Sequence, residues 1–252
     1  MGFSLRGNIQ AEASLIRLSV IFNNVSFDTC LKTSWGFSCL IEGTKDTILF
    51  DTGDQGDILL YNMKRMNIDP MGIDIVFLSH AHADHTGGLE ALLKKNNRVT
   101  VYLPESFPIS FKQTVKTYGA SVKAVDGPIQ ILDHVYSSGK MGDPIKEQAL
   151  ILKTPDGVAV ITGCAHPGIA NVVGKAKDLF NDDFCLVMGG FHLRGMTDPQ
   201  IREIIRKLKQ LGVDKIAPSH CTGEKAIDLF RKSWRDNFLE GGAGAIIELP
   251  WQ

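Results

Sequence analysis

The sequence contains no hydrophobic run long enough to cross a membrane. Its longest apolar stretches, such as residues 73–78 and 158–161, are far shorter than the roughly 20 residues that a spanning helix needs. The first ten residues also lack the positively charged start and the apolar segment of a secretory signal. We therefore expect no membrane contact and a soluble protein of the cytoplasm.

Cysteine is scarce, and its spacing shows no pairs. The chain has five cysteines, an odd number, which in a protein of this size indicates free thiols in a reducing compartment rather than disulfides. They are Cys30, Cys39, Cys164, Cys185 and Cys221.

Neither sign of charge is in excess, because 27 Lys and Arg residues are balanced by 28 Asp and Glu residues. No global positive field would draw in nucleic acid or an anionic membrane, so an anionic substrate must be held by a few local groups. We expect a small-molecule substrate and no nucleic-acid partner. A homo-oligomer stays open, because Trp234, Phe238 and Trp251 could pack against a second copy or complete the core.

Apolar residues make up 44% of the 252 residues, enough for one folded core, and we expect a single domain over residues 1–252. Short apolar runs alternate with segments of helical periodicity, which is typical of an α/β protein. The pattern predicts strands at residues 15–22, 36–41, 47–50, 73–78, 99–103, 121–125, 129–132, 148–153, 158–162, 184–188, 215–218 and 245–249, and helices at 57–67, 89–95, 169–180, 198–211 and 224–235.

The second half of the chain repeats the first. Residues 44–53 can be laid over residues 154–163, and residues 76–82 over residues 186–192, which places His192 opposite His82. A duplicated strand-turn-helix-strand unit predicts two pseudo-repeated halves that pack sheet against sheet, with helices outside. We therefore expect a four-layer αβ/βα sandwich with its functional site at strand ends between the halves.

The strongest chemical signal is the motif His80-X-His82-X-Asp84-His85, which follows an apolar strand. Residues two apart in an extended segment share a side, and the following turn returns Asp84 and His85. Imidazole and carboxylate together suit zinc first, with iron or manganese as alternatives, and no nearby cysteine pair indicates a closed structural zinc site. A solvated histidine cluster is the weaker interpretation.

Two later histidines also follow predicted strands. His166 lies between a strand and Pro167, which suits a first helical turn, and His220 lies between residues 215–218 and the helix that begins near Glu224. Each could be a ligand or a packing residue when considered alone.

Taken together, these motifs resemble the metallo-β-lactamase superfamily, and the resemblance covers nearly the whole chain. Leu49-Phe50-Asp51-Thr52-Gly53 upstream supports it. Within the superfamily, the segments 162–168, 189–193 and 219–223 resemble the branch of dihydropterin-ribofuranosylaminobenzene-phosphate synthases.

The resemblance implies a site for one or two divalent metal ions. His80, His82 and His166 would bind the first ion, and Asp84, His85 and His220 would bind the second. Asp51 would orient a ligating histidine by accepting its other ring N–H, although an aspartate before Thr-Gly could equally form a turn.

One position departs from the superfamily. Many members have a bridging aspartate at the end of the strand between the third and last histidines, where this chain has Gly189-Gly190-Phe191-His192. The second ion should therefore bind more weakly or use His192. His192 could instead transfer a proton or bind substrate beside Arg194, because arginine clamps carboxylates and phosphates, or it could simply pack at the strand end.

Thr222, before the last helix, could offer a backbone N–H nest to an anionic substrate, with Lys225 nearby, or could be a plain helix cap. Cys164 and Cys221 flank predicted ligands, but free cysteine is usually a small buried hydrophobe, so we expect neither in the metal set.

These residues predict a hydrolase in which a metal-bound hydroxide attacks a phosphoester, a lactone or a similar small anionic substrate, with Asp84 and His192 as the catalytic residues. Two alternatives stay open. The resemblance implies a transferase of the pterin and phosphoribosyl type, and the missing bridging aspartate would suit a metal-dependent binding protein without turnover.

Overall fold

Two β-sheets form the middle of the molecule. The computed structural model describes residues 14–251. The first sheet has the strand order β13 (Ile246–Trp251), β1 (Ser14–Asn23), β2 (Phe37–Glu42), β3 (Ile48–Phe50), β4 (Ile75–Phe77), β5 (Thr100–Pro104) and β6 (Ser121–Val125). The second has the order β12 (Val213–Ser219), β11 (Phe184–Gly190), β10 (Gly157–Thr162), β9 (Leu150–Thr154), β8 (Val135–Ser137) and β7 (Ile129–Leu132).

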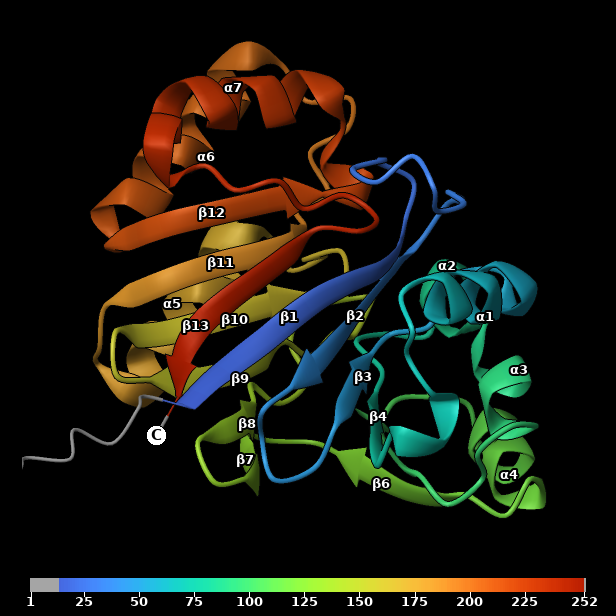
Figure 1. The fold of residues 1–252 in the computed structure, drawn as a ribbon. Helices are drawn as coiled ribbons and strands as arrows, with labels where there is room; N and C mark the ends of the chain where they lie inside the picture. Colours follow the sequence, from blue (N-terminus) through green and yellow to red (C-terminus); the bar gives the residue numbers. More distant parts are fainter. Residues whose placement is uncertain (1–13, 252) are drawn as a thin grey trace, which may run out of the picture.

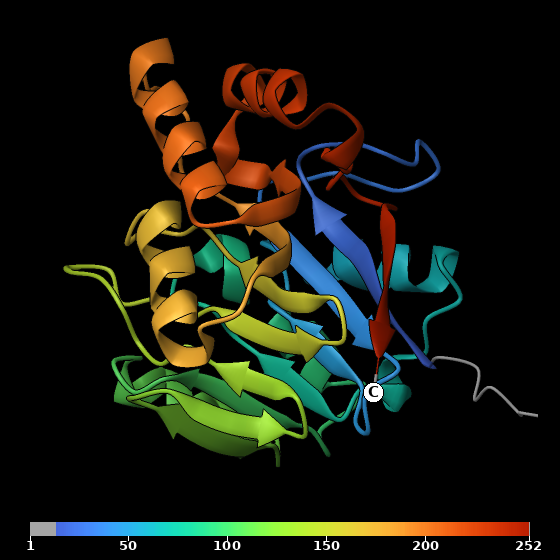
Figure 2. The ribbon, with the colours of Figure 1, turned by 90° about the vertical axis from the view of Figure 1, so that its left-hand side faces the viewer.

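Helices cover the outer faces of both sheets (Figure 1). The first sheet is covered by α1 (Gly56–Arg65), α3 (Leu89–Leu93) and α4 (Ile109–Thr117), while α2 (Ala83–Thr86) is a single turn near the sheet edge. The second is covered by α5 (Ile169–Phe180), α6 (Asp198–Gln210) and α7 (Glu224–Trp234), which lie along its outer face in Figure 2. Short 3₁₀ turns occupy Pro70–Gly72, His220–Thr222 and Arg235–Asn237. This is the four-layer αβ/βα sandwich expected from the sequence.

The central strands are apolar at consecutive positions because both of their faces are buried. In β10, Ala159 and Ile161 pack into the core between the sheets, whereas Val158 and Val160 pack against the helices of the second sheet. In the sequence these central strands therefore appear as continuous apolar runs, without an alternation of apolar and polar residues.

The two pseudo-repeated halves share one pattern of strand pairing. In the first half β2 pairs antiparallel with β3, and β3 pairs parallel with β4 after the crossover through α1. In the second half β9 pairs antiparallel with β10, and β10 pairs parallel with β11 after the crossover through α5.

Parallel pairing gathers the candidate site residues at one edge. The carboxyl ends of β3 and β4 lie side by side in the first sheet, and those of β10, β11 and β12 lie side by side in the second. Segments that follow these ends carry Asp51, the histidine motif, His166, His192 and His220.

Three of the helices and strands were not expected from the sequence: α4, β8 and the single helical turn α2, where the sequence predicts a turn. In α4 only Val115 is buried, so its apolar periodicity is weak, and β8 has only three residues. No helix within residues 14–251 combines the length and the apolar character that crossing a bilayer requires.

The loop of residues 24–36, between β1 and β2, is fastened to α1 by one buried side chain. Asn62 donates to the carbonyl oxygens of Ile21 and Lys32, each at 2.8 Å, and accepts from the backbone N–H of Lys32 at 2.9 Å. This loop also carries Asn24 and Trp35, which lie at the candidate site, so Asn62 links helix packing to the site.

We predict that Asn62→Leu lowers the free energy of unfolding by about 1–3 kcal/mol, because it leaves buried backbone groups without partners. Chemical denaturation would measure the loss. The matched control is Asn97→Leu, since the exposed Asn97 bonds only the carbonyl oxygen of Tyr118 and water can replace it; its effect should stay within about 0.5 kcal/mol. Equal losses in the two variants would contradict the role of Asn62.

Candidate metal centre

Three histidines converge from two sheets to form what we name the first group: His80, His82 and His166. Their ring centroids lie 4.7 Å (His80 to His82), 4.8 Å (His80 to His166) and 4.9 Å (His82 to His166) apart. His80 Nε2 lies 3.1 Å from His82 Nδ1, and one ring nitrogen of each histidine falls within 4.8 Å of the other two.

The spacing of the first group suits a metal ion. Two nitrogens bound to one tetrahedral zinc, each at about 2.0–2.1 Å, lie about 3.3 Å apart, close to the distance between His80 and His82. His166 Nε2 is buried and has no hydrogen-bond partner within residues 14–251. A buried polar atom without a partner is costly unless it binds something, and a cation at the centre of the group would satisfy it.

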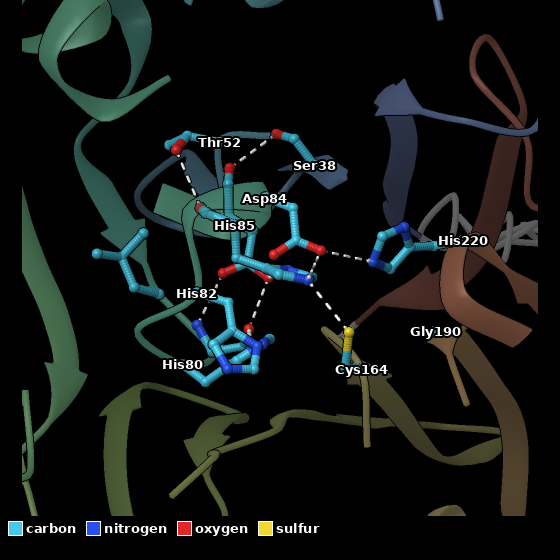
Figure 3. Close-up of polar contacts among 12 residues, drawn as sticks. Ser38, Thr52, His80, His82, Asp84, His85, Cys164, Gly190 and His220 are labelled. Carbon is cyan, nitrogen blue, oxygen red and sulfur yellow. Dashed lines mark hydrogen bonds and ion pairs between the residues drawn. The ribbon is translucent and has the colours of Figure 1, made fainter. Parts of the chain in front are cut away.

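The second group contains Asp84 and His85, from the turn of α2, and His220, from the end of β12. Asp84 Oδ2 lies 3.5 Å from His85 Nε2 and 3.3 Å from His220 Nε2 (Figure 3). The contact between Asp84 and His220 lacks hydrogen-bond geometry. Like His166 Nε2, His220 Nε2 is therefore buried without a hydrogen-bond partner among the described residues. The structure thus brings the six predicted ligands together in two clusters, and their binding of metal stays a prediction.

Cys164 also reaches the second group. Its Sγ lies 3.2 Å from His85 Nε2, and Figure 3 shows it pointing toward that ring. One ligand atom from each of Asp84, His85, Cys164 and His220 lies within 4.8 Å of the others. We expected Cys164 outside the metal set, because free cysteine is usually a small buried hydrophobe. Nothing in the sequence indicates that the residue two before His166 turns to the other group.

Three histidines are oriented through their Nδ1 atoms. His85 Nδ1 lies 2.7 Å from Asp51 Oδ2, His80 Nδ1 lies 2.9 Å from Ser79 Oγ, and His220 Nδ1 lies 2.7 Å from Asn24 Oδ1. Each contact occupies Nδ1 and leaves Nε2 facing the centre, which is how outer partners fix the tautomer of a ligating histidine. Neither Ser79 nor Asn24 was identified from the sequence.

Asp51 serves more than one of these segments. Its Oδ1 accepts from the backbone N–H of Ser79 at 2.7 Å, and its Oδ2 accepts from the Ser79 hydroxyl at 2.7 Å. Because Asp51 also contacts His85, it fixes both ends of the histidine motif. The φ angle of Asp51 itself is 51°, so the chain turns sharply at this residue after β3.

Glu147 fixes the turn that carries Cys164 and His166. Its buried carboxylate accepts from the backbone N–H groups of Cys164 and Ala165, each at 2.9 Å, and of His166 at 2.7 Å. Burial raises the pKa of Glu147, while these three N–H groups act in the opposite direction. No sequence motif singles out this glutamate, because its partners are backbone atoms of a distant loop.

Burial and like charges lower the pKa values of two histidines of the first group, His80 and His166. Desolvation, followed by the charges of neighbouring histidines, holds the pKa of His80 well below 6.5 and lowers the pKa of His166 to about 4. Burial also acts to lower the pKa of His85, but the carboxylates of Asp51 and Asp84 overcome it and raise this pKa to about 10.

The remaining predicted residues lie around the two groups. His192 belongs to neither: its ring centroid lies 4.4 Å from that of His166, and its backbone N–H donates to Cys221 Sγ at 3.3 Å. Thr222 is fully buried, and its hydroxyl accepts from the backbone N–H of Phe191 at 3.0 Å. The guanidinium of Arg194 lies 5.3 Å from the ring centroid of Trp35.

A cavity of about 640 Å³ opens beside His220. Trp35 lines the cavity with its ring 4.8 Å from the His220 ring, and Arg194 and Lys225 also line it. Trp35 was missed from the sequence, where it belongs to no motif and lies in a long loop.

Gly190 is the last residue of β11, the strand end at which the resemblance implies a bridging aspartate. A Cβ atom at this position would overlap the carbonyl oxygen of Gly163 and lie only 2.7 Å from Cys221 Sγ. No side chain fits there, so the second group receives no carboxylate from β11.

Comparisons with known proteins agree with this geometry. Residues 36–220 match the sequence model of the Metallo-beta-lactamase superfamily. The chain is 32% identical to 7,8-dihydropterin-6-methyl-4-(beta-D-ribofuranosyl)-aminobenzene-5'-phosphate synthase from Methanocaldococcus jannaschii, over 84% of this chain and 89% of that protein.

Solved structures show the same architecture. The crystal structure of Tm1679, described as a metal-dependent hydrolase of the beta-lactamase superfamily, is 28% identical, with a TM-score of 0.79 over 93% of this chain and 99% of that one. The metallo-beta-lactamase fold protein YhfI from Bacillus subtilis is 16% identical, with a TM-score of 0.68 over 94% of this chain and 100% of that one, which shows a shared fold.

We predict that Asp51→Asn weakens metal binding at the second group by about 10- to 100-fold, the range typical for the partner of a ligating histidine. The amide nitrogen of the new side chain would donate to His85 Nδ1, which moves the ring proton to Nε2 and blocks coordination. Competition with a chromophoric chelator measures the affinity. Asp74→Asn is the control, because its exposed carboxylate only accepts from the backbone N–H of Thr47. Unchanged affinity in the Asp51 variant would refute this role.

We also predict that the metal-free protein is most stable near pH 6.5. Between pH 6.5 and 4, His80 and His166 become protonated in the unfolded chain but stay neutral in the folded state, because folding lowers their pKa values. The free energy of unfolding therefore falls as the pH falls. Between pH 6.5 and 10 the folded state keeps a proton on His85 that the unfolded chain has lost, so stability falls as the pH rises.

Melting temperatures of chelator-treated protein across this pH range would test both slopes. The Asp51→Asn variant should lose most of the alkaline slope, because Asp51 contributes most to raising the pKa of His85. A wild-type melting temperature that rises from pH 6.5 to pH 9 would contradict a protonated His85.

Proposed function

Since the chain belongs to the metallo-beta-lactamase superfamily, we propose that it is a metal-dependent hydrolase that acts on a small anionic substrate. One observation supports this most directly. Buried nitrogens of His166 and His220, which come from separate strand ends, have no hydrogen-bond partner in residues 14–251 and face the two groups. The donor set of imidazoles and a carboxylate fits divalent ions, with zinc as our first choice and iron or manganese as alternatives.

When bound, the ions would supply an activated water and polarise an oxygen of the substrate. His80, His82 and His166 would hold the first ion, and Asp84, His85 and His220 the second. Asp84 would also have a catalytic role. Its Oδ2 approaches both histidines of the second group, which leaves Oδ1 free to accept a proton from the attacking water. Although burial acts to raise it, the close contacts with His220 and His85 hold the pKa of Asp84 well below its usual range, so it stays ionised.

His192 would transfer a proton on the opposite side of the site. Its imidazole lies beside His166 and lines a pocket of about 210 Å³ together with Trp35, Arg194 and Cys221. A hydrogen bond with Cys221 raises the pKa of His192, while burial opposes the rise. A histidine placed between the metal centre and solvent can give a proton to a leaving group and regain it from water.

Arg194 would bind the anionic part of the substrate. The other cations of the larger cavity are neutralised, because Lys225 lies 2.5 Å from Asp198 and Arg231 pairs with Asp228 and Glu240. Arg194 has no such carboxylate partner among the described residues and lies against Trp35. Its guanidinium is therefore available for a phosphate or carboxylate.

The second candidate is a transferase of the pterin and phosphoribosyl type. Trp35 favours it, because an indole ring that is 40% exposed beside the metal centre offers a stacking surface for a planar heterocycle. The M. jannaschii synthase, at 32% identity, is named for a product that contains a dihydropterin. Thr222 would contact the substrate through its backbone, because its hydroxyl already accepts a hydrogen bond from the backbone N–H of Phe191.

The setting of the protein is also proposed. Strands of both halves contribute to the core between the sheets, which supports a single domain over the chain. All five cysteines are free, in keeping with a reducing compartment, and we propose the cytoplasm.

The metal-loaded protein should release product from at least one class in a panel of phosphomonoesters, phosphodiesters and lactones. Arg194→Ala should lower kcat/KM about 10- to 100-fold through loss of a charged hydrogen bond, mainly by raising KM. Arg65→Ala, at an exposed position of α1, is the matched control and should leave both constants unchanged.

A parallel thermal-shift screen with pterins and phosphoribosyl compounds separates the candidates. The transferase would replace the hydrolase if no substrate of the hydrolysis panel released product and a pterin raised the melting temperature of the wild type but not that of Trp35→Ala. Metal binding without turnover or pterin binding would leave only a metal-dependent binding protein.

A further inference from the structure

The second group lacks an anionic ligand at the strand end where other members of the superfamily supply one. Asp84 is the sole carboxylate among the clustered ligand atoms of the group within residues 14–251, because Asp51 contacts His85 only at Nδ1, on the outer side of that ring. Gly190 cannot be replaced by a larger residue, since Cys221 Sγ and the backbone of Gly163 fill the space that its side chain would need. With Asp84 as its one anionic ligand, a divalent ion in this group would therefore keep one of its two positive charges unless a further anion binds it.

His192, the sequence-based candidate for this position, lies on the other side. Its ring packs against His166 of the first group, and it shares no cluster with Asp84, His85 and His220. Cys164 does share that cluster, with Sγ 3.2 Å from His85 Nε2. For ordinary zinc bond lengths of about 2.3 Å to sulfur and 2.0–2.1 Å to nitrogen, two such ligands of one ion lie about 3.5 Å apart, so only a small movement is needed.

The position of Cys164 is built into the fold. Glu147 holds the backbone N–H groups of Cys164, Ala165 and His166, and Ala165 has a φ of 55°. This turn sends His166 to the first group and Cys164 to the second. The Cys164 side chain is 3% exposed, so solvent does not compete strongly for the sulfur.

We propose that Cys164 Sγ, as a thiolate, is a ligand of the second metal ion and replaces the carboxylate that Gly190 cannot supply. On binding, the S–H bond breaks, a sulfur–metal bond forms, and the proton leaves to water. The second group then has two imidazoles, one carboxylate and one thiolate, a set that suits zinc or cobalt.

Cys221 has a different task. Its Sγ accepts from the backbone N–H of His192 at 3.3 Å and lies 3.7 Å from the carbonyl oxygen of Cys164, so it packs behind Gly190. It nevertheless forms a third cluster with Cys164 and His192, which makes it the natural control.

This inference rests on the metal binding proposed above, and cobalt(II) titration of the full chain tests the two separately. Bound cobalt(II) gives visible d–d bands at any of these ligands, whereas a thiolate ligand adds a charge-transfer band in the near ultraviolet. We expect both in the wild type. Cys164→Ser should keep the d–d bands, lose the charge-transfer band, and bind its second equivalent at least about tenfold more weakly. Cys221→Ser should keep the charge-transfer band.

Three results would overturn the proposal. A charge-transfer band that survives in Cys164→Ser, or one that disappears only in Cys221→Ser, assigns the sulfur elsewhere. The d–d bands without a charge-transfer band in the wild type would show a metal centre without thiolate, which leaves the proposed function intact. No cobalt binding at all would refute the metal centre itself.

X-ray absorption of the zinc-loaded wild type keeps the proposal testable if Cys164→Ser does not fold. The expected spectrum contains a zinc–sulfur distance of about 2.3 Å, equivalent to one sulfur for every two zinc ions. A first shell of nitrogen and oxygen alone would contradict the thiolate ligand.

Discussion

The geometry of the candidate centre depends on a buried carboxylate, that of Asp51. It accepts from the backbone and the hydroxyl of Ser79 and from the ring of His85, so a single side chain sets where the histidine motif begins and which nitrogen His85 presents. The second sheet closes onto the same point, because Gly163 leaves just enough room for Ser79 and Asp51. The contact of Gly163 with Ser79 and Asp51 thus both packs the two halves together and orients the predicted ligands.

The two groups differ in the charge of their side chains, so ions bound in them would have different roles. The first has only imidazoles, and the lowered pKa values of His80 and His166 keep these two neutral and available. The second has a carboxylate, with the Cys164 sulfur within reach, and borders the cavity that holds Arg194. An ion in the first group would retain more positive charge and be the stronger Lewis acid, whereas the second would be better neutralised. A substrate anion clamped at Arg194 would meet the second ion first.

Local pattern explains how much the sequence could predict. The histidine motif lies within six residues, and the alternating strands and helices encode both the sandwich and its strand ends, so the fold and most candidate ligands follow from spacing and resemblance. Glu147 and Asn24 could not be found this way, since they act on backbone atoms or rings far away in the chain. Trp35 carries no motif, and α4 buries only Val115, so neither leaves a periodic signal.

The loop of residues 24–36 has two functions at once. Asn24 contacts Nδ1 of the His220 ring, the Trp35 ring packs against the same imidazole, and Asn62 anchors the loop to α1. A ligand that stacks on Trp35 would therefore press on a metal-binding imidazole through the loop that also orients it. In the proposed centre, a ligand in the cavity would therefore alter the strength of the metal bond at His220.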